Sequence, residues 1–190
     1  MSLPKRREVV KALLANRGEL LVIAGLGSTA WDITAAGDSP LSFPLWGAMG
    51  QAAAMGLGLA LAQPGRRVLV ITGDGEMLMG LGSLATIGAQ QPANLSVVVI
   101  DNERYGETGM QATHTAHGVD LEAVARACRL RICSPDLNSL RNEIHGRAGP
   151  NFAALKVQAE KIPLVLPPRE GALLKARFRR ALLGPEADGV

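Results

Sequence analysis

Short apolar runs alternate along the chain with longer segments in which apolar residues recur at helical spacing. Unbroken β-branched runs are typical of strands buried on both faces of a parallel sheet, and they stand at residues 19–25, 68–72 and 96–101, with further strands expected at 130–134 and 152–160. Helices are expected between them, at residues 5–18, 31–36, 46–65, 81–90, 120–128, 137–146 and 170–190. This alternation predicts an α/β fold, a doubly wound and mainly parallel sheet with helices on both faces.

Composition narrows the class of protein. The chain has 190 residues, of which 47% are hydrophobic and 19% charged, so we expect one globular domain over residues 1–190, ending in a helix and tail over 168–190. A net charge of +3 and 3% aromatic residues give little support to nucleic-acid binding. The longest apolar stretch, residues 52–62, is too short to span a membrane, and no signal peptide is evident. We therefore expect a cytoplasmic protein.

Unusual polar chemistry follows three of the expected strands. The first strand ends in GLGSTA at residues 25–30, the second in Gly73-Asp74-Gly75, and the third in Asp101-Asn102. Because parallel strands end at the same edge of a sheet, Asp74 and Asn102 should stand side by side there. A carboxylate and an amide oxygen suit Mg²⁺, which completes its coordination with phosphates and water. With backbone N–H groups at Gly75 and a hydroxyl at Ser28, the residues predict a clamp for Mg²⁺ and a diphosphate.

A long polar stretch follows the third strand. Residues 102–118, NERYGETGMQATHTAHG, show no periodicity. Loops of this length in compact domains are more often functional than idle. We expect this loop to cover the site.

A wider resemblance rests on these motifs. GDG at 73–75 is separated by 26 residues from Asn102, and a G-x-M-G motif stands upstream at 47–50. The spacing resembles the diphosphate-binding motif of thiamine-diphosphate enzymes. The segments 46–61, 66–87 and 94–111 together resemble the cofactor domain of sulfopyruvate and phosphonopyruvate decarboxylases, within the acetolactate synthase and pyruvate decarboxylase superfamily. The similarity covers roughly residues 20 to 160.

The resemblance implies roles for individual positions. Mg²⁺ would be bound by Asp74, by the side chain of Asn102 and by the backbone carbonyl of Arg104. The Met49 side chain would lie beneath the cofactor and bend it into the reactive conformation, which makes it the principal catalytic candidate. The set implied to contact thiamine diphosphate comprises Gly27, Ser28, Gly47, Met49, Gly73, Asp74, Gly75, Glu76, Asn102, Arg104, Tyr105 and Gly106.

Further catalytic candidates come from the loop. Tyr105 and Glu107 belong to it, and His114 and His117 could donate protons, although a lone loop histidine is more often merely solvated. One position departs from the family pattern, because Glu76 stands where a small hydroxyl residue is common. A carboxylate beside a diphosphate is repulsive, so we expect the Glu76 side chain to turn outward and Glu76→Ser to leave cofactor affinity nearly unchanged.

The resemblance also implies a partner. Enzymes of this family need a second domain whose glutamate protonates the pyrimidine ring, and the 190 residues are used by one domain. We therefore expect a β-type subunit that acts with a separate α-type chain, as a heterotetramer or a dimer of its own kind, with the glycine-rich helix at 48–62 as a packing surface. The expected reaction is decarboxylation of a 2-oxoacid.

Three alternatives stay open at this point. A carboligating, acetolactate synthase-like subunit would use the same cofactor. A nicotinamide-binding Rossmann oxidoreductase would explain the G-x-G-x-x-A pattern at residues 25–30, but no acidic residue follows the next strand, Asp38 comes too early, and GDG and Asn102 would have no role. A non-catalytic regulatory subunit could retain the fold.

Overall fold

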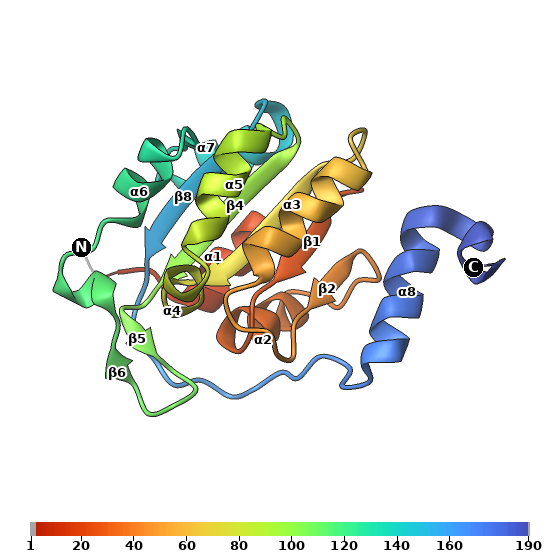
Figure 1. Ribbon diagram of the computed structural model, residues 1–190. Helices are drawn as coiled ribbons and strands as arrows, with labels where there is room; N and C mark the ends of the chain where they lie inside the picture. Colours follow the sequence, from red (N-terminus) through yellow and green to blue (C-terminus); the bar gives the residue numbers. More distant parts are fainter. Residues whose placement is uncertain (1–2, 190) are drawn as a thin grey trace.

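The computed structural model describes residues 3–189 (Figure 1). Its centre is a sheet of six parallel strands in the order β2-β1-β3-β4-β8-β7. The strand bounds are β1 Leu21–Ala24, β2 Ser42–Pro44, β3 Val68–Gly73, β4 Leu95–Asp101, β7 Arg131–Ile132 and β8 Asn151–Lys156. The main helices are α1 Arg6–Leu13, α2 Ser28–Ala35, α3 Ala52–Ala62, α4 Asp74–Met79, α5 Gly82–Gln90, α6 Leu121–Ala127, α7 Leu137–Gly146 and α8 Gly171–Leu183.

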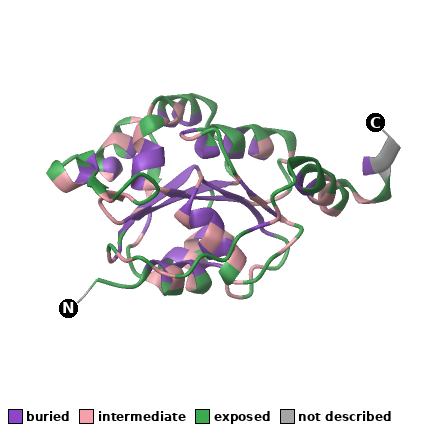
Figure 2. Cartoon of the chain, turned by 90° about the horizontal axis from the view of Figure 1, so that it is seen from below, coloured by how far each residue is buried: buried purple, intermediate pink, exposed green. Residues whose placement is uncertain are grey.

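Helices cover both faces of the sheet, and the buried residues gather on the strands between them (Figure 2). Successive strand side chains point to opposite faces, so Val22 packs with α1, α2 and α7 while Ile23 packs with α3, α5 and α6. Both residues are at most 1% exposed. The expected doubly wound α/β class is confirmed, because burial on both faces is what continuous β-branched strands require.

The strand order reverses next to β1. The chain passes from β1 to β2 on one side and then to β3 on the other. In doubly wound sheets ligands bind beyond the carboxyl ends of the strands at such a switch point. The register of β3 and β4 pairs Gly73 with Ile100, so Asp74 lies level with Asp101, one residue before Asn102.

Element boundaries differ from the sequence expectation in several places: α1 ends at Leu13, α2 already begins at Ser28, and β8 ends at Lys156. The segment bracketed by Pro40 and Pro44 contains an edge strand, β2, which pairs with β1. The helix expected from residue 46 begins at Ala52, because residues 46–51 form a turn. A helix begins at Asp74 itself, so GDG is a helix start as well as a strand end. The loop at 102–118 contains a short hairpin, β5 Arg104–Tyr105 with β6 Gln111–Ala112, and a 3-10 turn, His114–His117.

The C-terminal part of the chain runs beside the sheet. After β8 an extended segment leads to α8, which lies apart from the other helices at the β2 edge (Figure 1). There the Phe178 ring meets Phe43 edge to face with centroids 5.6 Å apart, and Arg177 pairs with Asp38. Across residues 3–189, none of the helices combines the length and the apolar character needed to cross a bilayer.

Candidate functional site

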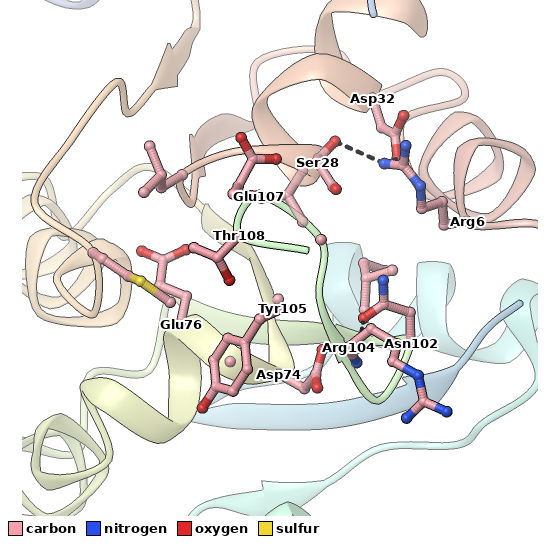
Figure 3. Close-up of a pocket in the computed structure, with 17 residues that line it drawn as sticks. Arg6, Ser28, Asp32, Asp74, Glu76, Asn102, Arg104, Tyr105, Glu107 and Thr108 are labelled. Carbon is pink, nitrogen blue, oxygen red and sulfur yellow. Dashed lines mark hydrogen bonds and ion pairs between the residues drawn. The ribbon is translucent and has the colours of Figure 1, made fainter. Parts of the chain in front are cut away.

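A cleft of about 160 Å³ opens at the carboxyl edge of the sheet, at the switch point (Figure 3). Its walls come from segments far apart in sequence: the end of β1 and the start of α2, the turn before α3, the start of α4, and the residues after β4. The cleft therefore collects all three of the strand ends that carry unusual polar chemistry.

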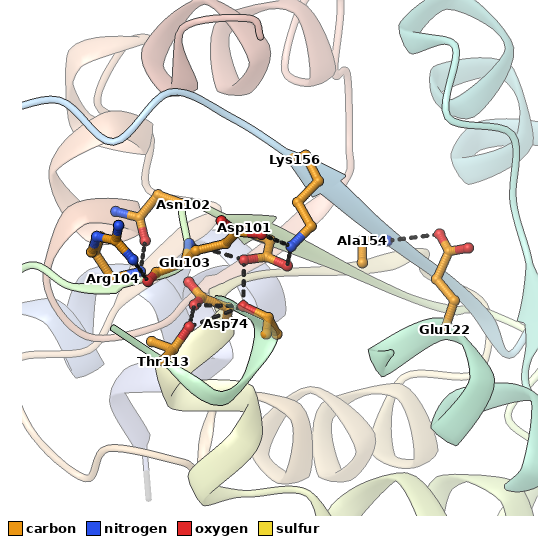
Figure 4. A network of polar contacts seen from close by, with 10 residues as sticks. Asp74, Asp101, Asn102, Glu103, Arg104, Thr113, Glu122, Ala154 and Lys156 are labelled. Atoms are coloured by element: carbon orange, nitrogen blue, oxygen red, sulfur yellow. Dashed lines mark hydrogen bonds and ion pairs between the residues drawn. The ribbon is translucent and has the colours of Figure 1, made fainter. Parts of the chain in front are cut away.

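Asp74 is a deeply buried carboxylate in this cleft, with 1% of its surface exposed. Its Oδ2 accepts a hydrogen bond of 2.5 Å from the Thr113 hydroxyl, and Thr115 Oγ1 lies 3.3 Å from the same oxygen (Figure 4). Burial raises the pKa of Asp74 to about 6; the Thr113 hydrogen bond opposes this shift and the charge of Asp101 adds to it. The chain thus keeps a carboxylate where water cannot solvate it.

Asp101 lies beside Asp74 but is already fully engaged. Its Oδ2 pairs with Lys156 Nζ at 2.9 Å, and its Oδ1 accepts from Thr115 Oγ1 at 2.9 Å and from the Glu103 N–H at 3.0 Å. The next residue, Asn102, turns its Oδ1 towards the backbone N–H of Arg104 at 3.0 Å. That Asn102 oxygen has a second lone pair, so Asp74 and Asn102, rather than Asp101, are the groups with capacity for a cation.

Glu76 also lines the cleft, and the expectation that its side chain turns outward is wrong. It is 4% exposed, and its Oε2 accepts from Thr72 Oγ1 at 2.8 Å. The carboxylate fills the space beside Gly25, where an added Cβ would lie 1.6 Å from Oε2. Burial raises the pKa of Glu76, while hydrogen bonding by Thr72 and by the backbone of Ala52, Leu26 and Gly50 opposes the shift. Local sequence missed this because the receiving space is made by distant segments.

The G-x-M-G segment forms a tight turn against α4. Gly50 has φ of +87°, and a Cβ on Gly80 would lie 1.9 Å from the Gly50 carbonyl oxygen, so the two backbones touch directly. Ala48 also has a positive φ, +56°, which is uncommon for a residue with a side chain. The turn thus packs its backbone directly on the end of α4, with Met49 half-buried at the cleft and Gly47 exposed.

The hairpin β5–β6 occupies part of the cleft. The Tyr105 ring lies over Gly75, where a Cβ would come within 2.5 Å of Cε1, and the Glu107 carboxyl lies over Gly27, where a Cβ would be 2.9 Å from Oε1. Partial burial raises the pKa of Glu107, and the charge of Arg6 opposes the shift. Both contacts fall on glycines that the sequence assigned to a diphosphate.

Most of the predicted site residues meet here. The cleft is lined by Ser28, Met49, Gly73, Asp74, Gly75, Glu76, Asn102, Arg104, Tyr105, Gly106 and Glu107. Gly27 lies beneath Glu107, next to this lining, whereas Gly47 lies outside it. His114 and His117 are exposed and do not line the cleft. The individual roles assigned to these residues stay predictions.

Two features of the site were missed from the sequence. Arg6, 3% exposed, lines the cleft and donates from Nη1 to the Ser28 carbonyl and to Asp32, which is fully buried (Figure 3). Its run of charges, KRRE, is typical of a solvated helix start. Thr113 and Thr115 were not predicted as site residues, although hydroxyl residues at alternate positions of an irregular loop are a signal of buried polar contacts.

The donor set can be tested against the expected groups. Among residues 3–189 there is no cluster of three or more His, Cys, Asp or Glu side chains able to hold a metal ion. A site built from one carboxylate, one amide and a backbone carbonyl fits Mg²⁺ with a diphosphate, since phosphate oxygens and water complete its octahedron. The glycines beneath the hairpin would admit such a group once Tyr105 and Glu107 move aside.

Comparison with known proteins settles the family. Residues 27–144 match the model described as thiamine pyrophosphate enzyme, C-terminal TPP binding domain. The chain belongs to the thiamine pyrophosphate enzymes. This confirms the resemblance inferred from GDG, Asn102 and G-x-M-G.

Relatives of this thiamine pyrophosphate enzyme chain match most of its length. It is 36% identical over 188 residues to sulfopyruvate decarboxylase subunit beta of Methanocaldococcus jannaschii, covering 94% of this chain and 97% of that one. It is 37% identical over 191 residues to phosphonopyruvate decarboxylase of Streptomyces viridochromogenes, covering 97% of this chain and 48% of that one. The fold matches benzoylformate decarboxylase from Polynucleobacter necessarius with a TM-score of 0.70, at 20% identity, over 83% of this chain and 34% of that one.

Proposed function

We propose that this chain is the subunit of a 2-oxoacid decarboxylase that binds Mg²⁺ and the diphosphate of thiamine diphosphate. One observation carries the proposal: β3 and β4 pair in a register that brings buried Asp74 and Asn102 to one cleft between glycines. The relatives described as sulfopyruvate decarboxylase subunit beta and phosphonopyruvate decarboxylase support the reaction class.

The chain's own residues would hold and orient the cofactor. Asp74 Oδ1, Asn102 Oδ1 and the Arg104 carbonyl would bind the cation, and the backbone at Gly75 and Gly27 would approach the phosphates closely. Met49, on the turn that packs against α4, would support the bent conformation. When bound, thiamine diphosphate supplies an electron sink for loss of CO₂ from a 2-oxoacid.

Two features support a requirement for a partner. The cleft of about 160 Å³ is smaller than the 300–1,000 Å³ usual for cofactor sites; the hairpin fills part of it, and a second chain would supply the remaining walls. The outer face of α3 carries no charge and exposes Met55 and Leu61; Met79 of α4, 68% exposed, lies next to Gly50 in the turn before α3. Apolar helices of this kind are normally buried. An α-type subunit supplying the catalytic glutamate would cover them.

The alternative of a nicotinamide enzyme finds no support at the neighbouring strand. A dinucleotide site places an acidic residue after the second strand to hold the ribose. Here β2 ends at Pro44 and is followed by Leu45 and Trp46. A thiamine diphosphate site agrees better with Leu45 and Trp46, because Trp46 directly precedes the G-x-M-G turn.

The test compares the chain alone with the chain co-purified with the product of a neighbouring α-type coding sequence. Thiamine diphosphate binding is measured with and without Mg²⁺, and CO₂ release is measured from sulfopyruvate, phosphonopyruvate and pyruvate. We expect Mg²⁺-dependent binding and turnover only in the combined sample. Asp74→Ala should weaken binding by more than about 100-fold, since even outer partners of metal ligands are worth 10- to 100-fold.

Asp38→Ala is the matched control, because Asp38 is an exposed aspartate paired with Arg177 away from the cleft. It should leave binding unchanged. Activity from the chain alone would contradict the partner requirement. Binding of NAD without thiamine diphosphate would overturn the cofactor assignment. A five-carbon product from two pyruvates, formed with loss of one CO₂, would show that carboligation follows decarboxylation in place of aldehyde release.

A further inference from the structure

The turn that follows the hairpin carries two buried hydroxyls on either side of an exposed histidine. Thr113 is fully buried and Thr115 is 5% exposed, while His114 between them faces solvent. Alternation of this kind directs the two threonines to the same side of the turn. Their hydroxyl oxygens lie 2.9 Å apart and contact Asp74 and Asp101 at the carboxyl ends of β3 and β4.

Each hydroxyl has one proton, and the distances indicate where it goes. Thr113 donates to Asp74 Oδ2 at 2.5 Å. Thr115 is closer to Asp101 Oδ1, at 2.9 Å, than to Asp74, at 3.3 Å, so its better contact is with the end of β4. The backbone N–H of Thr113 also donates to the Glu103 carbonyl at 3.0 Å, between Asn102 and Arg104. The turn thus bonds to both strand ends that carry the proposed ligands.

We propose that Thr113 and Thr115 are positioning residues for the metal site, forming a clasp that directs Asp74 Oδ1 towards the cation and fixes its spacing from Asn102. This inference rests on the proposed function. Because Thr113 occupies Oδ2, the carboxylate cannot rotate freely, and one oxygen is left for the metal. Because Thr115 and Lys156 occupy both oxygens of Asp101, that neighbouring carboxylate does not compete for the ion.

The chemistry of Mg²⁺ makes such a clasp consequential. Mg²⁺ requires nearly ideal octahedral geometry at 2.0–2.1 Å, whereas Ca²⁺ accepts longer and more variable contacts. Outer partners that orient a ligand are typically worth 10- to 100-fold in metal affinity. A loosened Asp74 should therefore cost Mg²⁺ more than Ca²⁺. A role confined to stability would lower both affinities together or neither.

The experiment uses the assembled enzyme and follows thiamine diphosphate binding by tryptophan fluorescence, since Trp46 precedes the G-x-M-G turn. The half-saturating concentrations of Mg²⁺ and of Ca²⁺ are measured at fixed cofactor. Thr113→Val removes the hydroxyl at nearly constant volume, and we expect the Mg²⁺ concentration to rise on the order of 10- to 100-fold, with a smaller rise for Ca²⁺. Thr113→Ser, which keeps the hydroxyl, should stay within about threefold of the unsubstituted enzyme.

Thr34→Val is the control for loss of a threonine hydroxyl elsewhere, because the Thr34 hydroxyl donates to the Ala30 carbonyl within α2 and Thr34 does not line the cleft. Folded Thr113→Val with an unchanged Mg²⁺ requirement, or with equal losses for both metals, would overturn the inference. If Thr113→Val does not fold, Thr115→Val decides by the same two criteria, since it keeps the Thr113 contact. Absence of metal-dependent binding in the unsubstituted enzyme would instead refute the proposed function itself.

Discussion

Polar side chains have different surroundings at the two ends of the parallel strands, the amino edge and the carboxyl edge of the sheet. At the amino edge, side chains of Arg17, Arg67 and Asn94 donate to backbone carbonyls, and Arg17 also donates to the Ser42 hydroxyl. Asn94 Nδ2 alone lies within 3.1 Å of three carbonyl oxygens. At the carboxyl edge, Asp74 and Glu76 are buried carboxylates with raised pKa values. Polar side chains at the amino edge satisfy backbone carbonyls of the chain itself. At the carboxyl edge, Asp74 and Glu76 are carboxyl groups shielded from water.

The difference agrees with the proposed metal site, which would need negative charge in a buried place. A buried carboxylate with a raised pKa destabilises the folded chain at neutral pH, because the folded state disfavours the charged form. A cation would reverse that effect at Asp74, since it favours the charged form. Residues that weaken the free chain and favour a ligand are expected at functional sites. Removing a carboxylate at the carboxyl edge should therefore stabilise the free chain at neutral pH and weaken binding. Removing a donor at the amino edge should destabilise the chain and leave binding unchanged.

The largest effect is expected from pH acting on Asp74 in the metal-free chain. Its folded pKa of about 6 lies above the ordinary value of 3.8, so its contribution to the free energy of unfolding is fully present below about pH 4 and is lost as the pH rises through 6. A shift of about two units corresponds to on the order of 3 kcal/mol. Urea unfolding across this range should show the decline, and Asp74→Asn should remove this part of it. Identical curves for the two proteins would contradict the burial argument.

The next effect concerns the space that Glu76 fills. Gly25→Ala should destabilise the chain by on the order of 2 kcal/mol, because the new Cβ would overlap Glu76 Oε2 and approach Thr72 Oγ1. Glu76→Ser in the same chain should recover part of this loss, so a double-mutant cycle of thermal unfolding measures the coupling. Gly82→Ala is the control, since nothing lies within 4 Å of a Cβ there. Additive effects of the two substitutions would show that the side chains do not share this space.

At the amino edge, Asn94→Ala is expected to lower the free energy of unfolding by a comparable amount without weakening cofactor binding. Asn94→Ala leaves the carbonyls of Ala60, Gln63 and Arg66 without this donor, which costs on the order of 1–2 kcal/mol at the usual net value of a hydrogen bond. Denaturant unfolding measures the loss, while thiamine diphosphate affinity in the assembled enzyme should be unchanged. If Asn94→Ala binds thiamine diphosphate more weakly under conditions in which it is fully folded, the amino edge would influence the cofactor site at the carboxyl edge.

The smallest effect is expected from the hairpin. Glu107→Gln removes a negative charge from the space over Gly27 and should tighten thiamine diphosphate binding by about threefold to tenfold. Titration at two salt concentrations checks the electrostatic origin, because screening should shrink the difference. Glu19→Gln, at the exposed amino edge, should have no effect. Weaker binding by Glu107→Gln would assign Glu107 a direct contact with the cofactor instead.

Prediction from the sequence succeeded where the pattern was local and periodic. The β-branched runs at 68–72 and 96–101 form β3 and β4, and the parallel pairing that follows from a helical crossover brings Asp74 and Asn102 to one cleft. It failed where a side chain is placed by segments distant in sequence. Glu76 turns inward because Gly25 leaves room and Thr72 offers a hydroxyl. The strand β2 was missed because a three-residue segment that ends in a proline gains strand structure only by pairing with β1.

The sequence by itself determined the fold class, the family and the strand ends at which the chemistry would gather, because periodicity and motif spacing are properties of the linear chain. Only the tertiary structure decided which groups are available there. Hydrogen bonds from Thr113 and Thr115, residues 39 and 14 positions away from Asp74 and Asp101, set which carboxylate oxygens are engaged. Contacts of that range follow from packing at the edge of the sheet: the alternating threonines could indicate two buried hydroxyls, but not the carboxylates that they reach.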